Sequence, residues 1–214
     1  MGKIDENYFK MNDNMKHNTI EDILDEDENV LLRLKPKKSA YILNSFLTML
    51  PFVLIWLCFD VGFIVIMATQ ANTHSIIWAF IVPFFAVHLM PVWIWLANIL
   101  KANRNHKNLE YAFTEKRIII RSGVIGIDFK NIYYSDIEGV NLKVGIIDRL
   151  CKVGDIYIQA NTQTSVILDI ENPYFILSKL QKIVLDIKTD IYFPNNLRPG
   201  ENDGYKTKYK GFDK

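Results

Sequence analysis

The sequence has few of the residues that build redox, metal or catalytic sites. Its 214 residues include only two cysteines, Cys58 and Cys151, and their spacing fits neither a metal site nor a disulfide framework. We therefore expect two free thiols. The four histidines are dispersed along the chain: His17, His74, His88 and His106. Because there is also no G-x-x-x-x-G-K-[ST] loop and no H-E-x-x-H motif, we predict no enzyme, no cofactor and no metal site.

An excess of charge of one sign is also missing. The formal net charge is +1, and residues 111–214 carry fifteen Lys or Arg against thirteen Asp or Glu. Nucleic-acid binding needs a basic stripe, so we expect no nucleic-acid partner. The balance hides a local contrast, because residues 1–30 hold nine acids and three lysines, whereas residues 31–40 hold four basic residues and no acid. A cleavable signal peptide is not expected, since the first apolar run begins near residue 40 behind this acidic leader.

The chain does contain two long apolar runs, Ala40–Ala68 and Ile76–Leu100, with a short polar break between them. A helix needs roughly 20 mostly apolar residues to cross the hydrocarbon core of a bilayer. Neither run alternates between apolar and polar residues, so the pattern favours helices over strands. We predict a transmembrane helical hairpin over residues 40–100, with helices at about 41–67 and 76–100 and a tight turn between them.

Basic residues flank this predicted hairpin, and the break between its helices has none. The positive-inside rule therefore places both termini in the cytoplasm, in a multi-pass membrane protein. The flanking residues are candidates for contacts with lipid headgroups: Arg33, Lys35, Lys37, Lys38, Lys101, Arg104 and Lys107. The alternative is that they act only as the orientation signal.

Two ionisable residues, Asp60 and His88, lie inside the apolar runs. Such residues are costly in a membrane, at about 2.5–3.5 kcal/mol for Asp at a helix centre. At about 1.5 Å per residue, their Cα atoms would differ in depth by roughly 6 Å, so direct pairing is possible but not well placed. They are candidates for a proton-linked pair, a helix–helix hydrogen bond or an oligomer contact. The alternative places Asp60 near the outer interface and leaves His88 neutral and internally bonded.

After the hairpin the pattern changes to short apolar runs separated by turn signals. We predict strands at residues 30–34, 117–121, 124–134, 139–144, 155–160 and 164–170. Asn172 and Pro173 then mark a helix start. The residues that follow place one apolar stripe on that helix: Ile176, Leu180, Ile183, Val184 and Ile187. The sequence thus predicts a cytoplasmic domain over 108–189, in which antiparallel strands are followed by one amphipathic helix.

The remaining segments are tails and connectors. Residues 1–25 are expected to form a mobile acidic tail, 26–39 a basic juxtamembrane segment, and 190–214 a polar C-terminal tail. One short segment has two interpretations, because its apolar residues Ile146, Ile147 and Leu150 are flanked by Lys143, Arg149 and Lys152. These apolar side chains either enter the membrane at headgroup level or pack on the domain.

The order of these pieces resembles a known family. The matching segments are a leader, the strands and turns, and the helix start: Glu28–Pro36, Tyr111–Gly123, Phe129–Tyr134, Ser135–Val140, Gly145–Leu150, Val153–Ile158 and Ile170–Pro173. With the apolar hairpin, they resemble the membrane-flanked bacterial pleckstrin-homology (PH) domain family over about residues 26–188. The resemblance implies an α+β protein of the bacterial cytoplasmic (inner) membrane, whose PH-like antiparallel β-barrel or sandwich is closed by one C-terminal helix. It implies no catalytic residues, and some relatives are associated with tolerance to antimicrobial peptides.

Two functions are compatible with these features. The first is a non-enzymatic interaction module at the inner leaflet that engages lipids, a partner membrane protein or a second copy of the chain, and contributes to envelope stress tolerance. The second is a subunit of a channel or transporter that uses Asp60 and His88. The second function requires oligomers, because two helices per chain cannot enclose a pathway.

Overall fold

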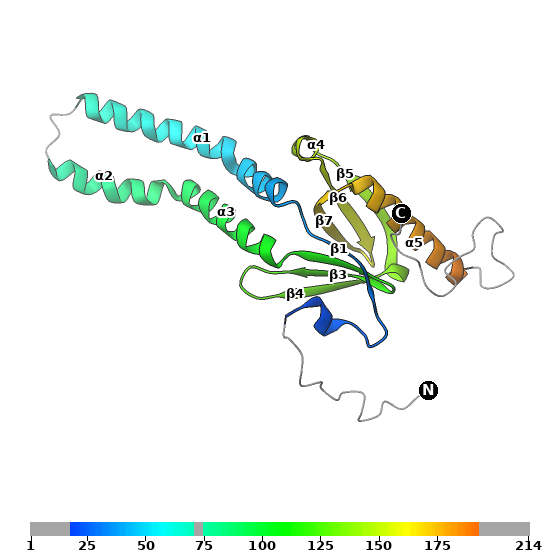
Figure 1. Ribbon diagram of the computed structural model, residues 1–214. Coiled ribbons are helices and arrows are strands. Elements are labelled where there is room, and N and C mark those ends of the chain that lie inside the picture. The colour runs from blue at the N-terminus through cyan, green and yellow to red at the C-terminus, as the bar shows by residue number, and fades with distance from the viewer. Residues whose placement is uncertain (1–17, 71–74, 193–214) are drawn as a thin grey trace.

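The computed structural model describes residues 18–70 and 75–192. A long helical hairpin projects from a domain of two β-sheets and a C-terminal helix (Figure 1). One arm of the hairpin is α1 (Lys38–Gln70), and the other consists of α2 (Ser75–His88) followed by α3 (Met90–Asn108). The predictions for residues 1–17, for the turn at 71–74 and for the tail from 193 onward lie outside the described residues.

The domain contains two antiparallel sheets. The first has the order β1-β2-β3-β4, with β1 (Val30–Leu34), β2 (Glu110–Thr114), β3 (Arg117–Ser122) and β4 (Asp128–Tyr133). A 3₁₀ turn, η3 (Tyr134–Asp136), leads to the second sheet, which contains β5 (Ile137–Lys143), β6 (Val153–Ala160) and β7 (Gln163–Glu171). The short helix α4 (Ile146–Cys151) connects β5 to β6, and α5 (Pro173–Tyr192) follows β7. Over the described residues no strand pairing joins the two sheets, so the predicted barrel is not closed.

The hairpin is inserted between the first two strands of one sheet. β1 precedes it and β2 follows it, yet Arg33 pairs with Ala112 and Leu34 pairs with Tyr111. Only residues 35–37 separate β1 from α1, and only Leu109 separates α3 from β2. Because both ends of the hairpin continue into paired neighbouring strands, the hairpin and the domain are tied together at two points.

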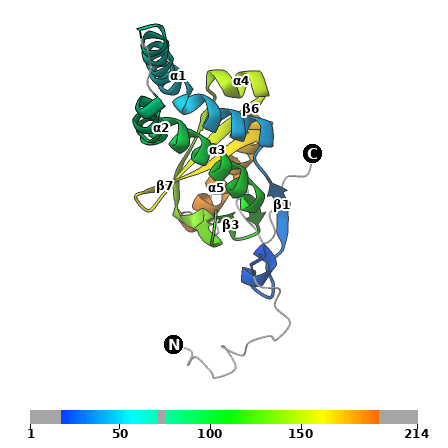
Figure 2. The ribbon, with the colours of Figure 1, turned by 90° about the vertical axis from the view of Figure 1, so that its left-hand side faces the viewer.

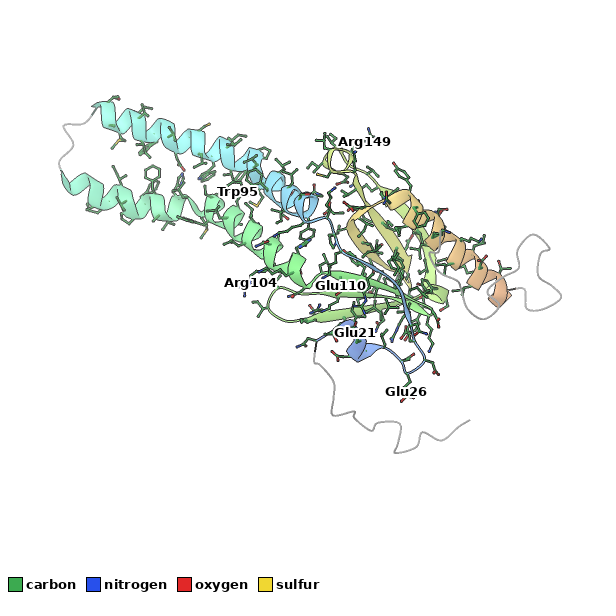
Figure 3. All side chains as sticks on the ribbon, viewed as in Figure 1. Glu21, Glu26, Trp95, Arg104, Glu110 and Arg149 are labelled. Atoms are coloured by element: carbon green, nitrogen blue, oxygen red, sulfur yellow. The ribbon has the colours of Figure 1, made fainter. Side chains whose placement is uncertain are left out.

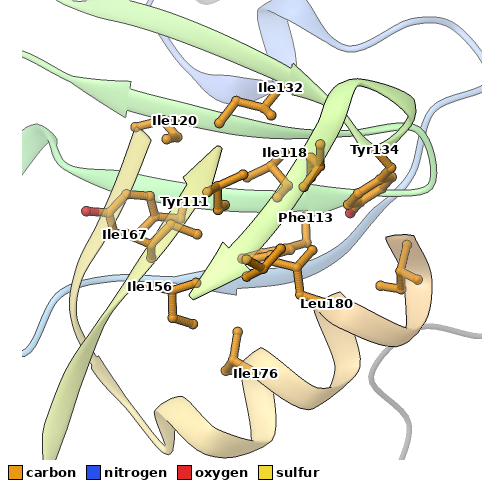
Figure 4. Packing of buried hydrophobic residues seen from close by; sticks show 14 of the residues in the cluster. Tyr111, Phe113, Ile118, Ile120, Ile132, Tyr134, Ile156, Ile167, Ile176 and Leu180 are labelled. Atoms are coloured by element: carbon orange, nitrogen blue, oxygen red, sulfur yellow. The ribbon is translucent and has the colours of Figure 1, made fainter. Parts of the chain in front are cut away.

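One hydrophobic core fills the space between the two sheets and α5. Tyr111, Phe113 and Ile118 enter it from the first sheet, and Ile156 and Ile167 enter it from the second (Figure 4). The predicted stripe on α5 covers this core: Ile176, Leu180, Ile183 and Val184 are buried, and Ile187 is partly buried. The period of this stripe therefore gave the correct face of the helix.

A second, smaller cluster lies on the other face of the first sheet. Ile20, in the 3₁₀ turn η2 (Ile20–Ile23), is 1% exposed and packs with Ala112 and Ile119. Glu28 and Arg117 form a buried ion pair beside it, with Nη2 of Arg117 2.7 Å from Oε2 of Glu28. The segment from residue 20 to 28, part of which the sequence assigned to the N-terminal tail, is thus packed on the sheet.

The loop between β3 and β4 is longer than predicted, because the strands expected at 117–121 and 124–134 left only Ser122 and Gly123 for a tight turn. β4 begins only at Asp128, so residues 123–127 form a longer connection. Gly123 has a φ of +140°, and a Cβ atom there would clash with the carbonyl oxygen of Gly126. Glycine is needed at this point because the backbone conformation and the close approach both exclude a side chain.

Candidate functional site

Most of the surface of α1 is apolar and lies outside the core. The stretch Lys38–Thr69 has a mean hydropathy of 2.4 in its most apolar window, and only 11% of that window is buried. Ile55 and Phe59, for example, are 73% and 70% exposed. A core helix of a soluble protein would bury such residues. By length and composition, α1 is able to cross a membrane.

The second arm of the hairpin is broken. α2 and α3 are together long and apolar enough for one span, but a 46° bend separates them at Leu89. The single helix predicted over 76–100 is therefore two helices in the structure. Pro91 lies in the first turn of α3, where its missing N–H is tolerated but prevents the hydrogen bonds of α2 from continuing.

Two tryptophans bind carbonyl groups at this break. The indole Nε1 of Trp56 donates to the carbonyl oxygen of His88 over 3.0 Å, and that of Trp93 donates to the carbonyl oxygen of Ala86 over 3.1 Å. Carbonyl groups left unpaired in apolar surroundings are costly, so these bonds stabilise the bend. The sequence alone does not distinguish these residues, because tryptophans are common large side chains within apolar runs and no local pattern shows which carbonyl group each would bind.

Asp60 and His88 are brought together across the hairpin. Nε2 of His88 lies 3.1 Å from Oδ1 of Asp60, and Asp60 is only 3% exposed. The His88 ring also stacks on Phe84, with ring centroids 5.0 Å apart. The second carboxylate oxygen of Asp60 is buried without a hydrogen-bond partner. The two side chains thus make a contact between α1 and α2, a direct pairing that the sequence had made look possible but not well placed.

The seven flanking basic residues divide into two groups. Arg33 and Lys37 bind acidic residues of the domain: Arg33 contacts Glu21 and Glu110, and Nζ of Lys37 lies 3.0 Å from Oε1 of Glu171. The other five are exposed and have no ion pair within residues 18–70 and 75–192: Lys35, Lys38, Lys101, Arg104 and Lys107. The structure therefore leaves these five cations open to other partners.

A polar junction joins the start of α1 to the second sheet. The backbone N–H of Lys37 donates to the carbonyl oxygen of Asp169 over 2.9 Å, and Nδ2 of Asn44 donates to Oδ1 of Asp169 over 2.9 Å. Asp169 is 2% exposed, and burial, together with the nearby charges of Asp155 and Asp148, raises the pKa of its carboxyl to about 7. The sequence alone does not indicate this cluster, because its residues come from α1, α4, β6 and β7 and meet only in the fold.

α4 presents apolar side chains to its surroundings. Ile146 and Leu150 are 84% and 79% exposed, whereas Asp148 is buried and accepts the N–H of Gly145 over 2.7 Å. The helix lies beside the start of α1, as Figures 1 and 2 show from two directions. Of the two interpretations of this segment, packing on the domain is therefore excluded for Ile146 and Leu150.

The β3–β4 loop adds a further exposed aliphatic residue at the end of α3. Ile125 is 95% exposed. The loop is fixed to α3, because Nδ2 of Asn108 donates to the carbonyl oxygen of Gly123 over 2.8 Å and the N–H of Gly123 donates to Oδ1 of Asn105 over 3.1 Å. The hairpin thus emerges from the domain between α4 and the β3–β4 loop, which both expose aliphatic side chains (Figure 1).

Among the described residues, no group of three or more His, Cys, Asp or Glu is arranged to hold a metal ion. Cys58 and Cys151 are both free thiols. The features of this structure that point to function are thus surfaces and contacts near the base of the hairpin.

The chain matches the family model of the bacterial PH domain over residues 45–187. The match covers more than half of the chain and includes much of the hairpin and the strands β2 to β7, whereas β1 lies before it. The protein therefore belongs to the bacterial PH domain family, which its motifs had implied. PH domains in general act as interaction modules and not as enzymes. A search of curated proteins and a search of solved structures found no match.

Proposed function

We propose that the protein is a membrane-anchored, non-enzymatic interaction module that holds its PH domain against the inner leaflet of the cytoplasmic membrane. The hairpin crosses the membrane twice, with α1 as one span and α2 with α3 as the other. Both termini lie in the cytoplasm, because the basic residues flank the hairpin where it joins the domain.

The observation that carries this proposal is the position of the exposed aliphatic side chains. Ile125 on one side of the hairpin base, and Ile146 and Leu150 on the other, are among the most exposed large apolar residues of the domain. They lie where a bilayer crossed by the hairpin would have its inner headgroups. Cations that lack an ion pair among the described residues, such as Lys38 and Lys101, occupy the same level and favour anionic lipids by about 1 kcal/mol each.

The rigid link between hairpin and domain supports the same function. Because β1 and β2 pair with each other and continue directly into α1 and α3, the domain cannot swing freely below the membrane. A domain held in one orientation offers the same face to lipids, to a partner membrane protein or to a second copy of the chain. Through such contacts the module would contribute to envelope stress or antimicrobial-peptide tolerance, and a deletion strain that tolerates these stresses normally would rule out that role.

Photo-crosslinking in native membranes tests the proposal. A photoreactive side chain at position 150 or 125 of the full chain is expected to crosslink to lipid or to a membrane protein. The matched control is position 185, because Leu185 is 60% exposed but lies on α5, which extends away from the hairpin (Figure 1). Equal crosslinking at all three positions, or none at 150 and 125, would contradict the proposal.

The contact between Asp60 and His88 favours a second candidate, a subunit of an oligomeric channel or transporter. A buried carboxylate paired with histidine inside a span is the arrangement that proton-linked transport uses. The double variant Asp60→Asn, His88→Gln, reconstituted into vesicles, is then expected to lose the ion or proton flux of the unmodified chain. Flux that is absent from the unmodified chain, or unchanged in the variant, would reject this function.

A further inference from the structure

A crevice lies between α1 and α3 near the base of the hairpin. It has a volume of about 310 Å³, and the tip of the β3–β4 loop closes one end through Val124. Trp95, about one helical turn from Asn98 on α3, does not line the crevice, and its ring packs on Phe46 with centroids 5.0 Å apart. Toward the domain the crevice ends at a hydrogen bond of 2.8 Å from Nδ2 of Asn105 to the hydroxyl of Tyr41. Trp95 and Arg104, labelled in Figure 3, lie on either side of the α3 residues Asn98, Lys101 and Ala102 that line the crevice.

Both helices contribute polar residues to the lining of the crevice, beside the apolar residues Met49, Ala102 and Val124. The polar residues follow helical spacing on each helix and so face one another: Tyr41, Ser45 and Thr48 on α1, and Asn98, Lys101 and Asn105 on α3. The seam between two packed helices is ordinarily apolar. Polar side chains at a helix seam next to lipid are costly unless they bind something. Helix packing alone therefore does not account for this set of residues.

The hydrogen bonds within the crevice leave donors unused. The hydroxyls of Ser45 and Thr48 already donate to carbonyl oxygens of their own helix, over 3.1 and 2.6 Å, so they offer only acceptor lone pairs to a ligand. The unused donors belong to Asn98 and Lys101. Nδ2 of Asn98 contacts only the sulfur of Met49, a weak acceptor, over 3.4 Å. Lys101 is exposed and has no ion pair in the described part of the chain, and an ammonium group carries three donors. No acidic residue lines the crevice, so its unused groups suit an anion.

We propose that this crevice binds the headgroup phosphate of an anionic phospholipid of the inner leaflet. Lys101 pairs with the phosphate, the amide of Asn98 donates to it, and the hydroxyls of Ser45 and Thr48 contact the polar remainder of the headgroup. The volume corresponds to on the order of ten water molecules, which is room for a phosphoglycerol group. Basic pockets between membrane helices on the cytoplasmic side are known to hold anionic headgroups. The inference rests on the proposed membrane orientation of the hairpin.

Lipid retention by the full chain tests this site. The protein is reconstituted with a mixture of phosphatidylglycerol and phosphatidylcholine, extracted in mild detergent and examined by native mass spectrometry. Lys101→Gln is expected to lower the retained phosphatidylglycerol about fivefold, the fold-change that corresponds to the attraction of one cation near a lipid surface. Thr48→Val removes a hydroxyl with almost no change in volume and is expected to lower retention as well.

The matched control is Lys107→Gln, because Lys107 is an exposed cation on the same helix but does not line the crevice. Equal loss in Lys101→Gln and Lys107→Gln, or no loss in Lys101→Gln, would overturn the site. Inorganic phosphate is the second probe: if it displaces phosphatidylglycerol, the crevice takes a soluble anion and the assignment to lipid is wrong. Resistance of each variant to carbonate extraction is measured in parallel, since loss of membrane insertion would contradict the proposed function itself.

Discussion

Replacing Asp169 by Asn tests how the hairpin is joined to the domain. Asp169 is buried where α1 meets β7, and it has a φ of +50°. Asparagine tolerates this left-handed conformation, and its side-chain oxygen can still accept the hydrogen bond from Asn44. The substitution therefore removes the ionisable group while it keeps the backbone and the contact with α1.

The direction in which stability changes with pH follows from the raised pKa of Asp169. Its pKa increases from 3.8 to about 7, because burial and the charges of Asp155 and Asp148 disfavour the carboxylate. The folded chain then binds more protons than the unfolded chain between these values, so this group makes stability decrease as the pH rises from about 4 to about 7. Each pH unit corresponds to about 1.4 kcal/mol, so ionisation of Asp169 lowers stability by up to about 4 kcal/mol above pH 7.

Urea unfolding of the full chain in detergent micelles, followed by circular dichroism between pH 4 and pH 8, measures this effect. We expect Asp169→Asn to be more stable than the unmodified chain by on the order of 1–4 kcal/mol at pH 8, with a smaller difference at pH 4. Asp128→Asn, which changes an exposed carboxylate on β4, is the control and should follow the unmodified profile. A variant that is less stable at pH 8, or that has the same pH dependence as the unmodified chain, would refute the reasoning.

Three further substitutions test the packing, each measured in the same unfolding assay. Glu28→Gln removes the closest counter-charge of the buried Arg117, leaves only Asp25 at 3.8 Å, and should cost about 3–5 kcal/mol. Burial raises the pKa of Glu28, but the hydrogen bonds from Arg117 and Thr114 outweigh it and hold that pKa below its usual value, so the loss should shrink as the pH falls through that pKa. Leu180→Ala should cost about 2–5 kcal/mol, since Leu180 is 0% exposed. A variant as stable as the unmodified chain would contradict the packing of α5 in the core. Gly123→Ala should cost about 1–3 kcal/mol through backbone strain, whereas Gly126→Ala, with open space at its Cβ position, should cost less.

The sequence predicted the helices and strands whose position depends only on residues that are neighbours in the chain. Asn172 and Pro173 marked the start of α5, and the spacing from Ile176 to Ile187 gave its buried face. Strands β3, β5, β6 and β7 lie where short apolar runs predicted them. In each case neighbouring residues alone determine the backbone conformation or the buried side.

The sequence did not predict the features that depend on contacts between residues far apart in the chain. The pairing of β1 with β2 joins residues on opposite sides of the hairpin, and no local pattern indicates such a partner. The burial of Asp169 depends on α1, and the contact of Asp60 with His88 depends on how two helices are offset. The segment Ile146–Leu150 had two interpretations, because its exposure depends on which surfaces the rest of the fold covers.

The depth of α4 relative to the bilayer tests the central claim most directly. The full chain, with Cys58 and Cys151 replaced by Ser, carries a fluorophore on a single cysteine at position 150 or position 185 and is placed in nanodiscs with spin-labelled headgroups. We predict strong quenching at position 150 and little at position 185. Equal quenching at the two positions, or none at position 150, would contradict the claim that the hairpin holds this face of the PH domain at the inner leaflet.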